Sequence, residues 1–261
     1  MALLAGATPV IIPTTIAQHF KITPAQLSAA ITPQTKLLWL NSPSNPSGIA
    51  YSLDELRALG DVLLQEPHVV IATDDMYEHM LWSGKFVNIV NAVPALQERT
   101  VVLNGVSKAY AMTGWRIGYA AGPLDLNDAM TTIQSQSTSN PCSISQKAAV
   151  AALRGGLEFT KQMVDAFADR HRYLVTCLQQ ISGIQTLPAD GTFYLFPDVS
   201  QLIEEKGFEN DLQFAEKLLQ QEGLALVPGS AFGLEGCIRL SFATSMQQLR
   251  GAMERLERFS R

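Results

Sequence analysis

The first half of this chain alternates short apolar runs with amphipathic segments, and this alternation limits its possible folds more than any other feature. The apolar runs have the length of buried strands, and they lie at residues 9–12, 36–40, 69–73, 100–103 and 116–120. Between them, Thr23 and Ser52 each begin a capping-box pattern that predicts the start of a helix. Strands that alternate with helices form a mostly parallel sheet with helices on its faces, so the sequence predicts an α/β fold.

The second half of the chain has a different pattern. Helices are expected at residues 124–137, 144–181 with a break at Gly155 and Gly156, 211–222 and 245–260. Four short strands are expected near residues 184–187, 193–197, 224–227 and 237–242. Short strands gathered around a few helices predict a smaller α+β domain. We therefore predict a large domain over residues 1–157 and a small C-terminal domain over residues 158–261.

The composition argues against several classes of function. The 261 residues carry a formal net charge of −5, which gives no support to binding of nucleic acid or of an anionic membrane. No apolar run approaches the ~20 residues that a membrane-spanning helix needs. The start of the chain, MALLAGATPVIIP, lacks the basic lead of a secretory signal. The 3 cysteines are widely spaced, so we expect a reduced, cytoplasmic protein and no metal site.

Unusual polar sequence follows three of the predicted strands. The motifs NSPSNPSG (41–48), DDMY (74–77) and NGVSK (104–108) each begin at or beside the end of an apolar run. In open α/β sheets, ligands bind beyond the carboxyl ends of the strands. An amide, a carboxylate with a phenol, and an amine would therefore converge on one edge of the sheet.

Each of these side chains has a plainer explanation when it is taken alone. The loop that holds Asn45 has the composition of a turn, and Asp74 is placed like a helix N-cap. A single lysine such as Lys108 is most often solvated, and Arg116 is of a type that commonly forms surface ion pairs. Only the combination favours a functional site.

The combination of a lysine and a nearby arginine indicates a specific chemistry. A lysine is a nucleophile only when neutral, and at a pKa of about 10.4 only about one in a few thousand is neutral at pH 7. Positive charge from Arg116 in a partly dry pocket would lower the pKa of Lys108 and make imine formation possible. Arg116 can also bind a phosphate through two parallel hydrogen bonds.

The other polar residues complete the description of one cofactor. A buried Asp74 would favour protonation of a ring nitrogen, and Asn45 with Tyr77 could hydrogen-bond a phenolate. An aldehyde for the lysine, a phosphate, a pyridinium and a phenolate together make up pyridoxal 5′-phosphate.

In these motifs the chain resembles the class I/II pyridoxal-phosphate-dependent aminotransferases of fold type I, the superfamily of aspartate aminotransferase. GVSKAYAMTGWRIG (105–118) is similar to the lysine-attachment signature of that family, and NSPSNPSG is similar to its N-P-x-N-P-T-G loop. DDMY is similar to its D-x-x-Y element, and CIRLSFA (237–243) is similar to its R-[LI]-S-[FY] strand. The resemblance covers essentially the whole chain.

The resemblance implies three catalytic residues. Lys108 would bind the cofactor covalently as an imine and would move the proton between Cα and C4′. Asp74 would pair with the pyridine nitrogen. Tyr77 would hydrogen-bond O3′ of the cofactor, together with Asn45.

The resemblance also implies phosphate and substrate contacts. Arg116 and Ser107 would contact the cofactor from its phosphate side. Arg239 would bind the α-carboxylate of the substrate, with Asn45 as a further substrate contact. The segments GTFYLF (191–196) and VPGSAFG (227–233) lie where the family has walls of its active site.

Two departures from the family pattern accompany this resemblance. Many relatives carry a serine three positions before the lysine, where this chain has Gly105, and Ser107 is the hydroxyl nearest to it in sequence. Residues 1–13 resemble a stretch well inside the large domain of relatives. We therefore expect a chain that lacks the N-terminal portion of the family, including the helix N-terminus that cradles the phosphate, so that its large domain is incomplete. Weak retention of the cofactor and little turnover are expected on this basis.

The resemblance favours one reaction and leaves others open. The leading prediction is transfer of an amino group between an L-amino acid and a 2-oxo acid, with aspartate slightly favoured, by a protein that is a homodimer in its full-length form. A related fold-type-I enzyme of the C–S lyase type shares the same cofactor residues and is the alternative among enzymes. A catalytically impaired fragment or a non-enzymatic aminotransferase-like module is the alternative outside enzymes.

Overall fold

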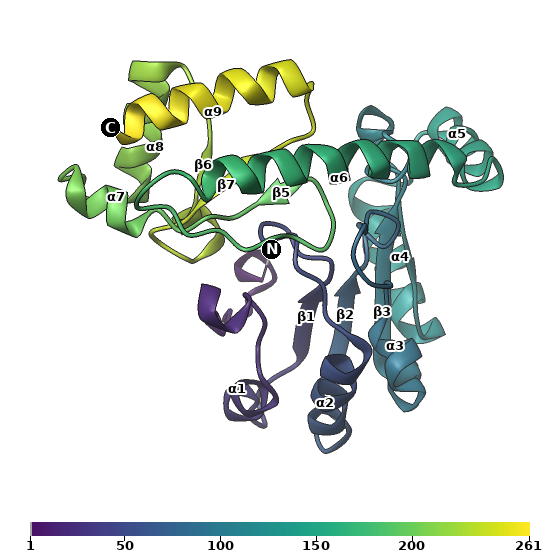
Figure 1. Ribbon diagram of the computed structural model, residues 1–261. Helices are drawn as coiled ribbons and strands as arrows, with labels where there is room; N and C mark the ends of the chain where they lie inside the picture. The colour runs from purple at the N-terminus through teal and green to yellow at the C-terminus, as the bar shows by residue number, and fades with distance from the viewer. Residues whose placement is uncertain (1) are drawn as a thin grey trace.

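The fold is built around two sheets, one in each half of the chain (Figure 1). The computed structural model describes residues 2–261, so that Met1, with which the predicted large domain begins, lies outside the described residues. In the larger sheet the strands follow the order β1 (Leu37–Asn41), β2 (Val70–Asp74), β3 (Thr100–Gly105) and β4 (Gly118–Ala121). The first three strands are parallel, and β4 runs antiparallel to β3.

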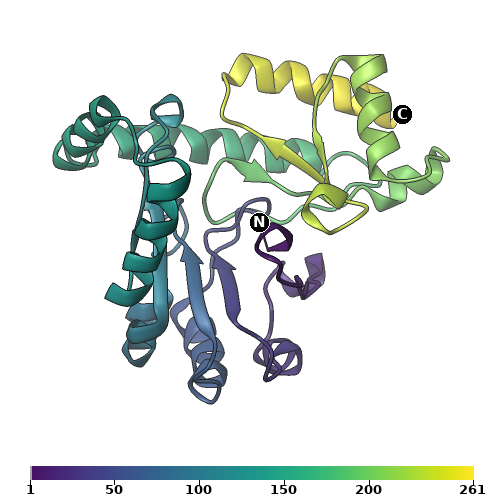
Figure 2. The ribbon, with the colours of Figure 1, turned by 180° about the vertical axis from the view of Figure 1, so that it is seen from behind.

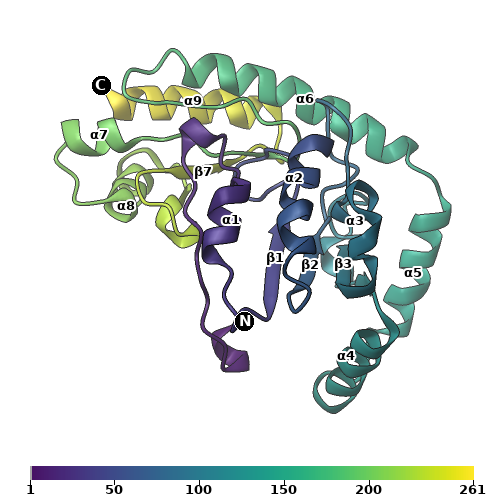
Figure 3. The same cartoon turned by 90° about the horizontal axis from the view of Figure 1, so that it is seen from below.

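Three helices cover one face of the larger sheet. They are α1 (Pro24–Ala30), α2 (Leu53–Leu64) and α3 (Ile89–Ala92), and a 3₁₀ turn over Pro94–Arg99 follows them. The expected capping boxes at Thr23 and Ser52 are both formed, which confirms these two helix starts. Figure 3 shows α1, α2 and α3 on the same side of the strands. Apolar side chains of these helices pack on the sheet residues Leu40 and Ile71 to make one core.

The opposite face of the larger sheet is largely open. Helix α4 (Leu124–Ser137) lies on this side, as the view from behind in Figure 2 shows, and it buries none of its residues. Along β1 the side chains alternate, so that Leu40 is buried while Leu37 and Trp39 are 50% and 58% exposed. All four residues of β4 are exposed as well. Among the described residues, no helix is long and apolar enough to cross a bilayer.

The second sheet is small and antiparallel, with the order β5 (Tyr194–Leu195), β7 (Ile238–Ser241) and β6 (Val227–Pro228). Helices surround it, namely α7 (Ser200–Glu205), α8 (Asp211–Glu222) and α9 (Met246–Ser260). Helix α5 (Ser143–Arg154) leads into the long helix α6 (Glu158–Leu178), which extends from the region of α5 to the small sheet (Figure 1). Phe167 and Leu174 of α6 are part of the core of this second unit.

Some expected strands are shorter than predicted or absent. The strand predicted at residues 9–12 is wrong, because this stretch is almost wholly exposed and has no strand partner among the described residues. At residues 184–187 only an isolated bridge between Gln185 and Asp198 forms. The strand predicted at 224–227 is reduced to Val227–Pro228. A strand needs a neighbouring backbone edge for its hydrogen bonds, which local sequence does not reveal.

A short segment ties the small sheet to the larger one. The backbone N–H groups of Asp190 and Gly191 both donate to the carbonyl of Gly48, at 2.9 and 3.0 Å. The N–H of Thr192 donates to the carbonyl of Met80 at 2.7 Å. We call residues 189–192 the inter-sheet strap. Because Tyr194 follows directly, the strap brings β5 and β7 next to the carboxyl ends of β1 and β2.

Candidate active site

The site begins where β1 and β2 end side by side. Asn41 and Asp74 are register partners at the last position of these two strands. The Asn41 amide donates to the Asp74 backbone carbonyl at 3.1 Å, and its Oδ1 accepts from the Asn45 N–H at 2.8 Å. These two hydrogen bonds fix the loop over residues 42–48 against the sheet, and they fix Asn45 with it.

A cavity of about 500 Å³ opens at this edge of the sheet. Eight residues line it, namely Trp39, Asn41, Asn45, Asp74, Met76, Tyr77, Lys108 and Tyr194. Four of them are residues that the sequence singled out: Asn45, Asp74, Tyr77 and Lys108. The structure therefore brings together side chains that come from three separate loops of the chain.

Lys108 occupies an environment that disfavours its charge. Burial lowers the pKa of the amine most, and the positive charges of Arg116 and Arg239 lower it further. The Nζ atom lies 5.7 Å from the centre of the Phe193 ring. A larger neutral fraction of this amine at pH 7 is what a nucleophilic lysine requires.

The two consecutive acids of the DDMY motif have different surroundings. Asp74 lines the cavity, where burial raises the pKa of its carboxyl and a hydrogen bond from the Met76 N–H at 3.2 Å opposes this rise. Asp75 is only 3% exposed and accepts hydrogen bonds from Thr73 Oγ1, at 2.7 Å, and from the Asn88 amide. Asp75 is therefore a core residue, and Asp74 is the carboxylate available to a ligand.

Tyr77 forms a buried pair with Tyr194. Their hydroxyl oxygens lie 3.2 Å apart, and the two side chains are 4% and 6% exposed. Burial raises the pKa of Tyr77, and the neighbouring Tyr194 hydroxyl and the Asp74 charge raise it further. Tyr77 is consequently a protonated phenol at physiological pH and a hydrogen-bond donor.

Arg239, in the middle of β7, reaches Asn45 across the two sheets. Its Nη1 donates to Asn45 Oδ1 at 3.0 Å, although the two residues are 194 positions apart in sequence. The guanidinium lies over two aromatic rings, with Cζ 4.6 Å from the centre of Tyr194 and 4.9 Å from that of Phe232. Its Nε has no hydrogen-bond partner within residues 2–261, and no acidic side chain there forms an ion pair with it.

Arg116 and Ser107 are the two expected cofactor contacts that do not line the cavity. Arg116 is exposed, adopts a left-handed φ of 55°, and donates from Nη1 to the Thr113 carbonyl at 2.9 Å. Ser107 is half-buried next to Lys108. Arg116 is nevertheless close enough to Lys108 for its charge to lower the pKa of the amine.

Gly105, the departure from the family pattern, has a steric cause in this fold. It pairs with Gly118 where β3 and β4 run side by side. A Cβ atom at position 105 would lie 2.9 Å from the Ile117 carbonyl oxygen and 3.1 Å from the Gly118 Cα. A serine at this position would require the backbone of β4 to move.

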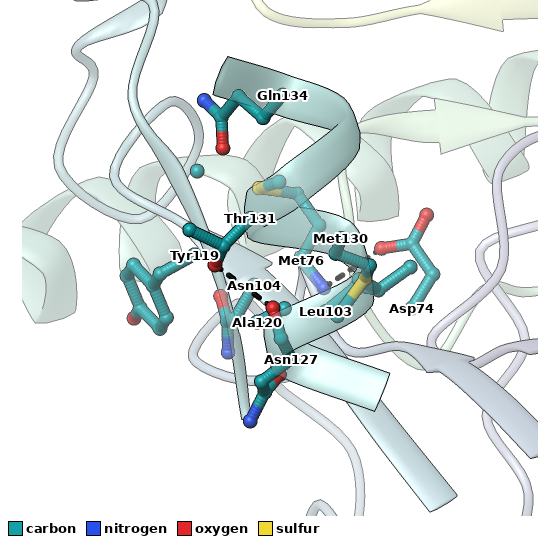
Figure 4. A pocket seen from close by; sticks show the side chains of 11 residues that line it. Asp74, Met76, Leu103, Asn104, Tyr119, Ala120, Asn127, Met130, Thr131 and Gln134 are labelled. Atoms are coloured by element: carbon teal, nitrogen blue, oxygen red, sulfur yellow. Dashed lines mark hydrogen bonds between the residues drawn. The ribbon is translucent and has the colours of Figure 1, made fainter. Parts of the chain in front are cut away.

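Figure 4 shows a second cavity, of about 590 Å³. It lies between the ends of β3 and β4 and helix α4, and Asn104, Tyr119 and Thr131 are among its lining residues. Asp74 and Met76 line both cavities, so the two spaces adjoin at these residues.

Sequence reasoning missed several lining residues. Trp39 and Asn41 face the cavity because side chains at positions i and i+2 of a strand share one face, and this periodicity was a usable signal. Tyr194 lies in the segment 191–196 that was expected to form a wall, but no role was assigned to it. Its pairing with Tyr77 follows only from the tertiary structure.

Comparisons with known proteins identify the family of the chain. The sequence profile of the family described as aminotransferase class I and II matches residues 1–256. The chain is 54% identical to the aspartate/prephenate aminotransferase of Nitrosomonas europaea, with 98% of this chain and 66% of that protein covered. It is 48% identical to the aspartate aminotransferase of Geobacillus stearothermophilus, with 98% and 65% covered.

A solved structure gives the same result. The aspartate aminotransferase of Rhizobium meliloti superposes with a TM-score of 0.95 at 44% identity, and the match covers 99% of this chain and 66% of that one. The predicted α/β fold with its mostly parallel sheet is thereby confirmed. This chain spans 65–66% of the length of these relatives. With a family profile matched over nearly all of its residues, the chain belongs to the class I and II aminotransferase family.

Proposed function

We propose that this protein is a pyridoxal-phosphate-dependent aminotransferase that moves an amino group between an L-amino acid and a 2-oxo acid, with L-aspartate as the favoured donor. One arrangement supports this function above all others. An amine with a lowered pKa, a half-buried carboxylate, a protonated phenol and an amide line a single cavity. Arg239, which has no acidic partner among the described residues, lies beside that amide.

Four side chains that line the cavity fit groups of the cofactor, whereas Arg116, expected at its phosphate, does not line the cavity. Lys108 is an amine for its aldehyde, Asp74 a carboxylate for its ring nitrogen, and Tyr77 with Asn45 supplies donors for its phenolate. Arg116 is the cation assigned to its phosphate. When bound, pyridoxal phosphate supplies an electron sink for negative charge that develops at the substrate Cα.

The protein's own groups would then position the substrate and move protons. Arg239 binds the α-carboxylate, because its fork of donors suits a carboxylate and lacks one within residues 2–261. Lys108, once neutral, would remove the proton from the substrate Cα and, as the protonated amine, would deliver it to C4′ of the cofactor as a general acid. Asp74 would hold a proton at the ring nitrogen, because a partly buried carboxylate attracts a cation more strongly than an exposed one does.

The names of the relatives guide the choice of substrates. The relative from Nitrosomonas europaea is named aspartate/prephenate aminotransferase, and the relative from Geobacillus stearothermophilus is named aspartate aminotransferase. We therefore propose L-aspartate as the donor and either 2-oxoglutarate or prephenate as the acceptor to be tested.

Reduction with borohydride tests the cofactor assignment. The purified chain is mixed with pyridoxal phosphate, reduced, digested and examined by mass spectrometry. We expect a visible absorption band and a covalent adduct on Lys108, with no adduct in Lys108→Ala. Lys147→Ala serves as the matched control, because Lys147 lies on α5 and does not line the cavity. An adduct distributed over surface lysines would refute the assignment.

Half-reactions distinguish the reaction types. Transamination predicts that L-aspartate bleaches the visible band and yields oxaloacetate, and that either acceptor restores the band. Release of pyruvate and sulfide from L-cysteine would instead identify a C–S lyase. A Lys108 adduct with no response to any amino acid would indicate a cofactor-binding module without catalysis.

We also propose the setting in which the protein works. Transaminases of this family are expected to act as homodimers, and the free state of Cys142, Cys177 and Cys237 supports a reduced, cytoplasmic location. The division into domains at residues 157 and 158 is supported by the start of α6 at Glu158. Limited proteolysis near this position tests the division.

A further inference from the structure

We propose that Tyr194 is a positioning residue of this site, whose hydroxyl orients the phenol of Tyr77 and whose ring orients the guanidinium of Arg239; this role rests on the proposed function. Tyr194 would thus connect the group that contacts the cofactor with the group that binds the substrate carboxylate. Tyr194 lines the same cavity as Lys108 and Asp74.

The position of Tyr194 allows both contacts at once. Its hydroxyl oxygen lies 3.2 Å from that of Tyr77, and the Cζ of Arg239 lies 4.6 Å from the centre of its ring. Tyr194 and Arg239 sit on the adjacent strands β5 and β7, where Tyr194 pairs with Ser241 and Leu195 with Leu240. One side chain therefore contacts both functional groups through its two ends.

The backbone that leads into Tyr194 is closely packed. Its N–H donates to Thr192 Oγ1 at 3.1 Å, and Thr192 is fully buried with a left-handed φ of 70°. At Gly191, a Cβ atom would lie 2.2 Å from the Met80 carbonyl oxygen, so the chain passes Met80 closely. A non-glycine residue with positive φ is held there only by its surroundings, which indicates a firmly determined position.

Either hydroxyl of the pair could be the donor, and a ligand oxygen that accepts from Tyr77 would favour Tyr194 as the donor. Each phenol can donate one hydrogen bond, and Tyr77 remains protonated because burial and its neighbours raise its pKa. The charged or titratable groups that face this pair are Asp74, Lys108 and Arg239. If Tyr194 donates to Tyr77, the Tyr77 proton is free to point into the cavity. The hydrogen bond from Tyr194 then strengthens the one that Tyr77 donates to a ligand, because hydrogen bonds in series polarise one another.

The ring of Tyr194 has a separate effect on Arg239. The guanidinium contacts the rings of Tyr194 and Phe232, and its Nη1 donates to Asn45. A cation in contact with two aromatic rings is attracted to both and loses much of its freedom to rotate. An arginine held in this way meets a carboxylate at a lower entropic cost.

Two substitutions separate the hydroxyl from the ring. Tyr194→Phe removes only the hydroxyl, whereas Tyr194→Leu removes the ring as well. Tyr173→Phe is the matched control, because Tyr173 is a half-buried phenol on α6 that does not line the cavity. The first measurement is the pH midpoint of the visible band of the protein loaded with pyridoxal phosphate. The second is the calorimetric affinity for maleate without added cofactor.

The hydroxyl role predicts a change in the spectrum. With Tyr194→Phe, Tyr77 becomes a weaker hydrogen-bond donor to the phenolate oxygen of the cofactor. That oxygen then keeps more negative charge and holds the neighbouring proton more tightly. The midpoint should therefore rise by about half a pH unit or more, since one hydrogen bond corresponds to roughly this shift. Tyr173→Phe should leave the midpoint unchanged. An unchanged midpoint in Tyr194→Phe would overturn the hydroxyl role.

The ring role predicts a change in anion affinity. Tyr194→Leu should weaken maleate binding by about tenfold, the size of a desolvated cation–π contact, while Tyr194→Phe should bind maleate like the wild type. Equal effects of the two substitutions, or no binding of maleate by the wild type, would overturn the ring role. Absence of a Lys108 adduct in the wild type would refute the proposed function separately, because the maleate measurement needs no cofactor.

Discussion

At the scale of single residues, the surroundings decide what each ionisable group can do. Asp74 and Asp75 are adjacent and chemically identical, yet only Asp74 lines the cavity, and Asp75 is enclosed by Thr73 and Asn88. The sequence favoured Asp74 only through the spacing of the D-x-x-Y element. The spacing of this element does not by itself show which of the two neighbouring carboxylates the packing buries.

Substitution of the two acids should separate their functions. Asp74→Asn should lower the rate of the L-aspartate half-reaction by about a hundredfold or more, because an amide does not stabilise a proton on the ring nitrogen. The visible band should persist, since Lys108 remains. Stopped-flow absorbance measures the rate, and Asp75→Asn is the control that should retain most of it. Equal losses in the two variants would contradict the assignment of Asp74.

Two buried groups should give opposite pH dependences of stability. Burial raises the pKa of Asp75 from 3.8 to about 6, so between these values the folded state holds more protons and stability falls as the pH rises. Burial lowers the pKa of His171 from 6.5 to about 4, so the unfolded state holds more protons and stability rises with pH over that range. Each effect amounts to up to about 3 kcal/mol.

Substitution of each residue should isolate its contribution to the pH dependence of stability. Relative to the wild type, Asp75→Asn should gain stability from pH 4 to pH 6, because the opposing carboxylate is gone. His171→Gln should lose stability over the same range, and the glutamine oxygen can still accept the hydrogen bond that the Ala189 N–H now gives to His171 Nε2 at 2.8 Å. Urea unfolding at each pH measures the difference in free energy of unfolding between variant and wild type. The contributions of the other titrating groups are the same in both proteins and cancel in this difference. Parallel pH profiles for all three proteins would show that these groups are not responsible.

At the scale of elements, the inter-sheet strap has the greatest influence on the site. It joins Gly48, in the loop that carries Asn45, to Met80, three residues after Tyr77, and it leads directly into β5. The helices and central strands were predicted from the period of the apolar residues and from the helix caps. The bounds of α4 and α8 match the expected ones. The strap was not predicted, because its hydrogen bonds join residues more than 100 positions apart.

Glycine substitutions test the close approach at the strap. Gly191→Ala should lower the free energy of unfolding by about 1–3 kcal/mol, because its Cβ would lie 2.2 Å from the Met80 carbonyl oxygen. Gly251→Ala is the matched control on α9, where nothing lies within 4 Å of the new Cβ. This control should raise stability by about 0.5–1 kcal/mol through its helix propensity. Similar urea midpoints for both variants would contradict the tight contact.

At the scale of the whole molecule, the two faces of the larger sheet differ in cover. Helices α1, α2 and α3 bury one face, whereas Trp39 of β1 is 58% exposed on the other and Ile133 of α4 is 71% exposed. Large exposed apolar patches on soluble proteins mark surfaces that associate. The low share of charged residues, 16%, agrees with such a surface but gave no indication of its location.

This open face predicts self-association of the chain. Sedimentation velocity should show species larger than a monomer whose share grows with concentration, and Ile133→Lys combined with Leu37→Lys should reduce that share. Lys substitutions at the exposed Asp128 and Gln136 of the same helix serve as the control and should change it little. A monomer at all concentrations would show that the open face does not associate.

The sequence by itself determined the α/β class and the residues that could carry the chemistry. The period of the apolar residues, the helix caps and the motifs after the strand ends are all local properties of the sequence. The motifs singled out Lys108, Asp74, Tyr77 and Asn45 before any contact was known. Tertiary structure alone decided that Arg239 contacts Asn45 and that Tyr194 contacts both Tyr77 and Arg239. The physical reason is that desolvation and charge interactions depend on which surfaces meet, and those surfaces belong to segments far apart in the chain.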